Sequence, residues 1–276
     1  MATDDSSWAA GESMGVGMSH DPFRIDGPTC ISFSGGRTSA YMLWRVLQSH
    51  GGKLPADAVV CFANTGKEDE ATLRFVRECS RRWAVPITWV EYGRGVVTFD
   101  TASRDGEPFA ALIAKKRYLP NPTARFCTSD LKVVPIAAAA PDDAETMIGV
   151  RADEPRRIPK LRARGLLVPL ADAGVTQSDV QAFWRAQQFD LGLSFQDGGT
   201  PLGNCDLCFL KGPNQIKSLI AAKPERALWW AYQEQFVNAT FRSDRPSYSV
   251  MLKTAEDQHD FIGHGDEEAI ACFCGD

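Results

Sequence analysis

A short β-prone run followed by two glycines constrains this chain more than any other feature. Residues 30–33 favour a strand, Gly35 and Gly36 follow almost at once, and apolar residues then recur at helical spacing up to residue 47. This order predicts a strand, a tight loop and a helix. Two consecutive glycines let the backbone turn so that amide N–H groups meet a ligand at the positive end of the helix dipole. The segment therefore predicts a site for a phosphate or sulfate group.

The residues that flank the glycines add to this interpretation. We expect Thr38 and Ser39 to cap the helix and to present their hydroxyls, and Arg37 to add a positive charge. The spacing matches neither GxxxxGK[ST] nor GxGxxG. An ordinary strand–helix turn would contain the same residues. This turn, however, follows the first strand of an α/β pattern, where ligands bind at the carboxyl edge of the sheet.

The rest of the first half of the chain alternates between strand and helix patterns. Strands are predicted over 58–63, 86–92 and 146–150, and helices over 68–83 and 129–140. This alternation predicts the α/β fold class, with a parallel sheet and helices on both of its faces.

The 276 residues are expected to form a loosely ordered N-terminal tail over 1–22, a nucleotide-binding domain over 23–170 and a mostly helical C-terminal lobe over 171–276. The lobe is predicted to open with a helix capped by Thr176, and it carries a CxxC motif and a terminal CFC.

Charge and hydropathy exclude several classes of protein. The chain has 30 Lys and Arg against 35 Asp and Glu, a net charge of −5, so it lacks the broadly basic face of a protein that coats nucleic acid. Two local basic groups remain, one over 115–125 and one over 151–164. The sequence contains no apolar run of about 18 residues and no export signal, so we expect a cytoplasmic protein that does not enter a membrane.

The eight cysteines divide into two sets. Cys30, Cys61 and Cys79 lie in apolar or helical runs and are predicted to be buried packing residues. The other five lie in polar, turn-like segments: Cys127, Cys205, Cys208, Cys272 and Cys274. A CxxC pair suits an iron–sulfur cluster or a zinc ion, and it also suits a redox dithiol. The further cysteines favour a metal site, whose negative charge Lys211 would stabilise.

Five segments carry a resemblance to a known family. SFSGGRTS resembles the PP-loop of the adenine-nucleotide alpha-hydrolase group, and the remainder resembles its phosphoadenosine phosphosulfate (PAPS) reductase branch. The other matching segments are FANTGKEDEATLRFV, RFCTSDLKVVPI, IGVRADEPRR and CDLCFLKG. The resemblance spans residues 29–212, and the whole pattern is also similar to uncharacterised phage and prophage proteins.

The resemblance implies a Rossmann-like PP-loop fold, a nucleotide site, a metal site and two catalytic residues. The implied nucleotide-binding residues are Ser34, Gly35, Gly36, Arg37, Thr38, Ser39, Asn64, Thr65, Gly66, Arg125 and Arg151. The implied metal ligands are Cys127, Cys205, Cys208 and Cys272, for a [4Fe–4S] cluster or alternatively Zn²⁺. The implied catalytic residues are Lys132 and Cys274, the latter because reductases of this branch carry a cysteine before a glycine on a mobile tail; the roles of Cys272 and Cys274 could be exchanged.

Two departures from the family pattern keep the reaction open. ATP pyrophosphatases of the group have an acid in the loop where this chain has Thr38, and cluster-bearing reductases have a second cysteine where it has Thr128. One interpretation is thiol-dependent reduction of an adenylyl sulfate, which the arginines and Lys132 favour. Another is ATP-dependent sulfur transfer to a nucleobase or a DNA phosphate. The missing second cysteine, the missing tail signature around Cys274 and the basic group over 115–125 favour it, whereas Thr38 in place of the acid weakens a metal-assisted ATP-splitting role.

A third interpretation is a non-catalytic nucleotide-binding zinc module. Across these alternatives the expected partners are an adenine nucleotide (ATP with Mg²⁺, or adenylyl sulfate), an electron or sulfur donor protein, and a nucleic acid substrate.

Overall fold

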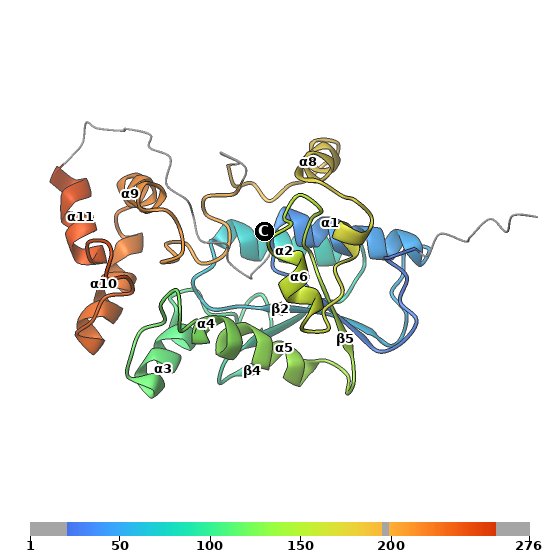
Figure 1. Ribbon diagram of the computed structural model, residues 1–276, viewed down its shortest axis with the longest axis horizontal. Coiled ribbons are helices and arrows are strands. Elements are labelled where there is room, and N and C mark those ends of the chain that lie inside the picture. Colours follow the sequence, from blue (N-terminus) through green and yellow to red (C-terminus); the bar gives the residue numbers. More distant parts are fainter. Residues whose placement is uncertain (1–20, 195–198, 258–276) are drawn as a thin grey trace, which may run out of the picture.

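The computed structural model describes residues 21–194 and 199–257, and its centre is a five-stranded sheet in the order β4-β3-β2-β1-β5 (Figure 1). The strands are β1 (Thr29–Ser32), β2 (Ala58–Ala63), β3 (Thr88–Glu91), β4 (Gly95–Val97) and β5 (Glu145–Ile148). The pairs β1–β2, β1–β5 and β2–β3 are parallel. The predicted α/β class with a mostly parallel sheet is therefore confirmed.

One edge of the sheet differs from the all-parallel expectation. Strand β4 is antiparallel to β3, with Glu91 opposite Gly95. Only three residues join the two strands, and Gly93 and Gly95 have φ values of 73° and 71°. A connection this short makes a hairpin, because a parallel neighbour would need a crossover of a dozen or more residues.

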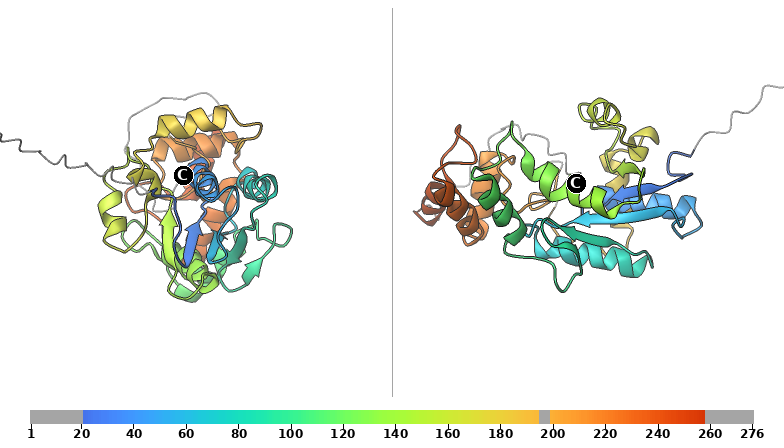
Figure 2. Two further views of the ribbon diagram at one scale, coloured as in Figure 1. Left: turned by 90° about the vertical axis from the view of Figure 1, so that its right-hand side faces the viewer. Right: turned by 90° about the horizontal axis from the view of Figure 1, so that it is seen from below.

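Helices cover both faces of the sheet, as Figure 2 shows. Helices α1 (Arg37–Ser49) and α2 (Glu70–Arg82) lie on one face, and α5 (Val134–Ala139) packs against β2 and β3 on the other. The predicted helix over 129–140 begins earlier, as α4 (Phe126–Thr128), and passes through a π-helical turn, η1 (Ser129–Val133), before α5. Such π turns recur at functional sites because they re-aim side chains within a helix.

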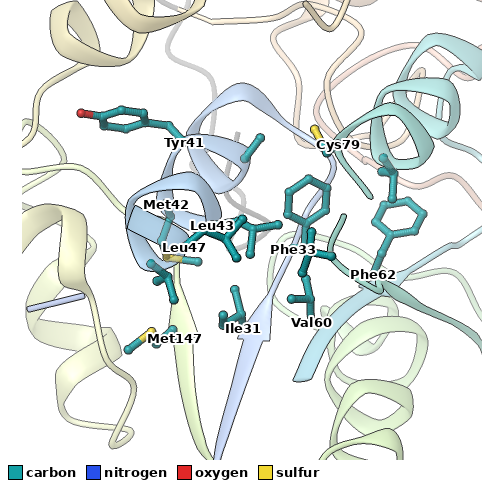
Figure 3. Packing of buried hydrophobic residues seen from close by; sticks show 14 of the residues in the cluster. Ile31, Phe33, Tyr41, Met42, Leu43, Leu47, Val60, Phe62, Cys79 and Met147 are labelled. Atoms are coloured by element: carbon teal, nitrogen blue, oxygen red, sulfur yellow. The ribbon is translucent and has the colours of Figure 1, made fainter. Parts of the chain in front are cut away.

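The main hydrophobic core lies between the sheet and α1 and α2 (Figure 3). Ile31 and Val60 come from the strands and Leu43 from α1, and all three side chains are almost completely buried. Helix α8 (Gln177–Arg185) joins this core through Trp184, whose Nε1 donates a hydrogen bond of 2.9 Å to the carbonyl of Arg37. The predicted Thr176 cap of α8 is confirmed, with Asp179 completing the capping box.

A second hydrophobic cluster holds the C-terminal helices together at one end of the molecule (Figure 1). It joins α9 (Pro213–Ala222), α10 (Arg226–Val237) and α11 (Tyr248–Asp257) to α3 (Glu107–Lys116) and to the segment around Cys205. The two clusters are interleaved along the chain, so packing gives no sharp break near residue 170. The domain limits stay a prediction.

Two short helices complete the described chain, α6 (Ile158–Arg162) and α7 (Pro169–Asp172). Among the described residues, no helix combines the length and the apolar character needed to cross a membrane.

Candidate active site

The order of the strands places a switch point beside β1. The chain runs from β1 to β2 and β3 on one side, and β5 then pairs with the other side of β1. The loops that leave β1 and β5 therefore diverge and open a crevice at the carboxyl edge of the sheet, where open α/β sheets bind their ligands.

The loop after β1 is held by Ser39. The backbone N–H of Ser34 donates to the Oγ of Ser39 at 3.2 Å, and the Ser39 hydroxyl donates to the carbonyl of Gly36 at 3.0 Å. Gly35 has a φ of +80°, and a Cβ on it would lie 2.7 Å from Cγ2 of Thr72. Only glycine fits there, because both the left-handed backbone and the lack of space exclude a side chain.

The predicted helix caps are wrong in this loop. The N-cap of α1 is Gly36, without a side-chain cap, and Thr38 and Ser39 lie within the first turn of the helix. Their hydroxyls have other partners: Ser39 fixes the loop, and Thr38 accepts a 3.3 Å hydrogen bond from Nη1 of Arg151.

The loop after β5 closes the other side of the crevice. A Cβ on Gly149 would lie 3.0 Å from the Cα of Ser39, so this glycine lets the two loops approach. Arg151 follows two residues later, and its Nε donates to Asp153 at 2.9 Å. Asp153 also accepts the backbone N–H of Gln177, at the start of α8, at 3.0 Å. Arg151 is thus held at the crevice by residues on both sides.

A pocket occupies this crevice. Six predicted nucleotide-binding residues line it: Ser34, Gly35, Gly36, Arg37, Thr38 and Arg151. Gln177, Gln181, Thr200 and Asn204 also line it and were missed by the sequence analysis, because they lie far along the chain from the loop. None of the described residues that line the pocket carries a carboxylate.

Arg37 braces the wall of the pocket. Its Nε donates to Oδ1 of Asp190 at 2.7 Å, and its other nitrogens bond the carbonyl of Leu193 at 2.8 Å and the hydroxyl of Thr200 at 3.2 Å. Burial raises the pKa of the Asp190 carboxyl, but the hydrogen bonds and charge of Arg37 outweigh it and leave that pKa below its ordinary value. The charge of Arg37 is therefore largely neutralised before any ligand binds.

Asn64, Thr65 and Gly66 do not line this pocket. Asn64 is buried, and its Nδ2 donates to the buried carboxylate of Glu91 at 2.6 Å while its Oδ1 accepts the N–H of Gly66 at 3.1 Å. The structure thus gives Asn64 a part in holding the turn after β2.

Thr65 instead faces a buried thiol. Its hydroxyl donates to the carboxylate of Glu68 at 2.9 Å and shares a 3.4 Å hydrogen bond with Sγ of Cys205. Since the single proton of the Thr65 hydroxyl goes to Glu68, the Cys205 thiol is the donor to Thr65. Burial, with the charge of Glu68, raises the pKa of Cys205 well above its ordinary value, and Lys132 partly opposes this.

Lys132 reaches this buried group from the π turn, with its Nζ 3.8 Å from Oε1 of Glu68. One compact polar cluster is thus formed by Lys132, Glu68, Thr65 and Cys205. We call it the Cys205 polar cluster. Sequence analysis missed Glu68, although an acid three residues after Thr65 in a tight turn was the available signal.

The remaining predicted metal ligands are only partly brought together. Cys127 and Cys208 are half-buried and pack against the same hydrophobic cluster as Cys205. Within the described parts of the chain, however, no three His, Cys, Asp or Glu side chains gather in a way that could hold a metal ion. The described residues alone therefore do not fit a cluster or zinc site, and Cys272 and Cys274 lie outside them.

Two other basic residues have structural partners. Lys211 donates to the carbonyls of Gly203 at 2.8 Å and Cys205 at 3.0 Å, so it closes the CxxC loop, whereas the sequence suggested a charge for a cluster. Arg125 is half-buried, does not line the pocket, and donates from Nε to the carbonyl of Pro122 at 3.0 Å. The packing cysteines Cys30, Cys61 and Cys79 are buried as predicted.

Fold and site together define an α/β protein with a pocket at the switch point of a mostly parallel sheet. No family model matches the chain. The chain is similar to the uncharacterized nin region protein ORF290 of Escherichia phage lambda, with 34% identity over 230 residues that cover 77% of this chain and 75% of the phage protein. The chain belongs to the family of this phage protein. The phage origin of this relative agrees with the resemblance to phage proteins.

Proposed function

We propose that this protein binds an adenine nucleotide in the switch-point pocket, with the anionic end of the nucleotide on the loop over 34–36. One observation carries the proposal: the loops after β1 and β5 meet at a pocket lined by a glycine turn, the start of α1 and Arg151. Backbone N–H groups at a helix N-terminus and an arginine are the donors that recognise phosphate and sulfate.

The donors that line the pocket favour an adenylyl sulfate over ATP. Mg²⁺, which accompanies ATP, is usually held by one or two carboxylates, and no described lining residue supplies one. Thr38 occupies the loop position where ATP-splitting relatives have an acid. The pocket offers instead the guanidinium of Arg151, whose charge Asp153 and Glu154 partly balance, and the neutral amides of Gln177 and Gln181, which suit a phosphosulfate without a metal.

The reaction that we propose is thiol-dependent reduction of the bound adenylyl sulfate. A thiolate attacks the sulfur atom of the bound adenylyl sulfate. The sulfur–oxygen bond to the phosphate breaks, and the nucleoside monophosphate leaves with the bonding electron pair. The enzyme then carries an S-sulfocysteine, which a second thiol from a dithiol reductant protein cleaves to sulfite and a disulfide. Cys274 remains our predicted nucleophile.

The competing function is ATP-dependent sulfur transfer to a nucleic acid. The Cys205 polar cluster favours it, because Asn204 lines the pocket and directly precedes Cys205. In this reaction ATP would adenylylate an oxygen of the acceptor and release pyrophosphate. The outer sulfur of a donor persulfide would then displace AMP, and a second thiol of the donor would free the sulfur on the acceptor by forming a disulfide. The two functions differ in the nucleotide that they consume.

Calorimetry tests the proposal. We expect adenosine phosphosulfate to bind without Mg²⁺, and ATP to bind more weakly under the same conditions. Arg151→Ala should weaken binding about 10- to 100-fold, as expected for the loss of charge-assisted hydrogen bonds. Arg156→Ala is the matched control, because Arg156 is exposed on the same loop and does not line the pocket.

Product analysis then separates the two reactions. Sulfite with a nucleoside monophosphate supports reduction, and pyrophosphate from ATP supports sulfur transfer. If neither nucleotide binds, or if both arginine variants bind equally well, the proposal is wrong.

A further inference from the structure

Helix α10 presents an apolar stripe to solvent although its other side is fully packed. Leu228, Tyr232 and Phe236 follow one another at intervals of four residues and are 58%, 61% and 43% exposed. Ala227 and Trp230, on the opposite side of the helix, are completely buried in the second hydrophobic cluster. The stripe is therefore not needed for the core. The rings of Tyr232 and Phe236 lie nearly parallel, at 21°, with their centroids 6.4 Å apart.

The end of α3 extends this stripe with cations and a further ring. Arg117 ends α3 in a left-handed conformation, and its guanidinium carbon lies 5.7 Å from the centroid of the Phe236 ring. Lys115 and Tyr118, two residues before Arg117 and one residue after it, are also exposed, and the Tyr118 ring packs edge-on against that of Phe126. Both helices lie at the same end of the molecule (Figure 1). The combined surface, here called the aromatic–basic face, consists of Lys115, Arg117, Tyr118, Leu228, Tyr232 and Phe236.

The charge of this face is positive, in contrast to the net charge of the chain. The neighbouring acids are already paired: Asp130 lies 2.9 Å from Nζ of Lys116, and Glu225 lies 3.7 Å from Nζ of Lys223. No carboxylate of the described chain lies within ion-pair distance of Lys115 or Arg117, although the charge of Lys115 helps to lower the pKa of the Asp130 carboxyl. An otherwise acidic protein thus places two exposed cations at the end of α3, and one of them, Arg117, lies over the exposed ring of Phe236.

We propose that the aromatic–basic face binds single-stranded nucleic acid. Exposed bases stack on aromatic side chains, and this stacking tolerates any sequence because every base has a π face. Lys115 and Arg117 would contact the phosphates, and Arg117 also stacks on the ring of Phe236. A duplex hides its base faces, so isolated rings on a convex helix favour a single strand. This face is separate from the switch-point pocket, and the inference does not rest on the proposed nucleotide chemistry.

Fluorescence anisotropy with labelled oligo(dT) and oligo(U) tests this inference on the full chain. We expect the double variant Tyr232→Ala/Phe236→Ala to weaken binding at least about tenfold, since each stacked base loses its platform. Lys115→Gln should weaken binding of both strands and reduce the slope of log affinity against log salt by about 0.7, the value for one phosphate contact on a single strand.

The matched controls are Val96→Ala, an exposed apolar side chain on β4, and Lys53→Gln, an exposed lysine in the turn after α1. Neither should change the affinity. Arg151→Ala should also bind the oligonucleotides normally, so failure of the nucleotide proposal leaves this result intact.

Three outcomes would overturn the inference. The first is that neither oligonucleotide binds at low salt, and the second is that the face variants bind like the controls. The third is that sedimentation shows self-association of the wild-type chain that the double variant abolishes, which would assign the face to a second copy.

Discussion

The switch-point pocket and the Cys205 polar cluster adjoin at residues 204 and 205 and differ in almost every physical respect. The pocket is lined by backbone, amides and Arg151 and is open to a ligand, whereas the Cys205 polar cluster is buried and holds the Glu68 carboxylate 3.8 Å from Nζ of Lys132. Asn204 lines the pocket and Cys205 belongs to the cluster, so a single peptide bond separates the two regions.

This difference shows what each region can do as it stands. The pocket presents donors before an anion arrives, which is the preorganisation that binding requires. The Cys205 polar cluster keeps the Cys205 sulfur protonated, because burial and the charge of Glu68 both disfavour a second negative charge and so raise the pKa of the thiol. A nucleophilic or metal-binding role for Cys205 therefore requires a change in its surroundings, and the experiments below address the two regions separately.

The largest effect should come from Gly35→Ala in the pocket. The added Cβ meets Cγ2 of Thr72 at 2.7 Å and the φ of +80° becomes strained, so we expect a loss of about 2–4 kcal/mol of unfolding free energy together with loss of nucleotide binding. Urea unfolding and calorimetry measure both. Gly36→Ala is the control for stability alone, because its φ of −97° suits any residue, whereas its place in the pocket lining leads us to expect weaker nucleotide binding in this variant too. Equal stability of the two variants would show that the loop adopts another conformation.

The next effect concerns the metal predicted at Cys205 and the other cysteines of the CxxC region. The sequence predicts about four irons per chain, as a [4Fe–4S] cluster requires, although the described geometry brings no three ligands together. Protein purified anaerobically should contain this iron and lose it in Cys208→Ser. Cys79→Ala should keep it, because Cys79 is buried in the other hydrophobic cluster. Zinc in place of iron would support the structural alternative, and protein without either metal contradicts both predictions.

A smaller effect should follow from Glu68→Gln. Glu68 is the charged neighbour that raises the pKa of Cys205, so neutralising it should lower that pKa and increase the thiolate fraction at any pH below it. We expect alkylation of Cys205 at pH 8, followed by mass spectrometry, to become about three- to tenfold faster. Glu70→Gln serves as the control, since Glu70 lies on α2 and pairs with Arg104. An unchanged rate would show that burial alone protects the thiol.

The smallest effect should be the pH dependence of the pocket wall. The pKa of Asp190 is lower in the folded protein, so its ion pair with Arg37 contributes above the unfolded pKa and is lost as the pH falls through the folded value. The free energy of unfolding should therefore fall by about 0.2–1 kcal/mol when the pH is lowered below the usual range for aspartate, which is what a partly exposed pair supplies. Urea unfolding over this pH range measures the change, and Asp190→Asn should remove this part of it. A pH profile of stability that this variant leaves unchanged would assign the effect to other carboxylates.

Much of the local structure follows from the sequence. The apolar runs predict β1, β2 and β3 at their places, and the pattern from Thr176 predicts α8 with its cap. These predictions succeed because strand and helix periodicity, glycine turns and capping residues act over a few residues. The glycine pair after β1 also locates the loop that lines the pocket. Strand β4 and the π turn were missed, because a three-residue hairpin and a helix register depend on what packs around them.

The sequence by itself determined the α/β class, the buried cysteines and the position of the glycine loop, because each depends on neighbouring residues. Only the tertiary structure decided which side chains share a site. It turned Arg37 toward Asp190, gave Asn64 to Glu91, and separated Thr65 from the pocket that Arg151 enters. A charged or polar side chain takes the partner that folding brings within hydrogen-bond distance, and that partner can lie more than a hundred residues away.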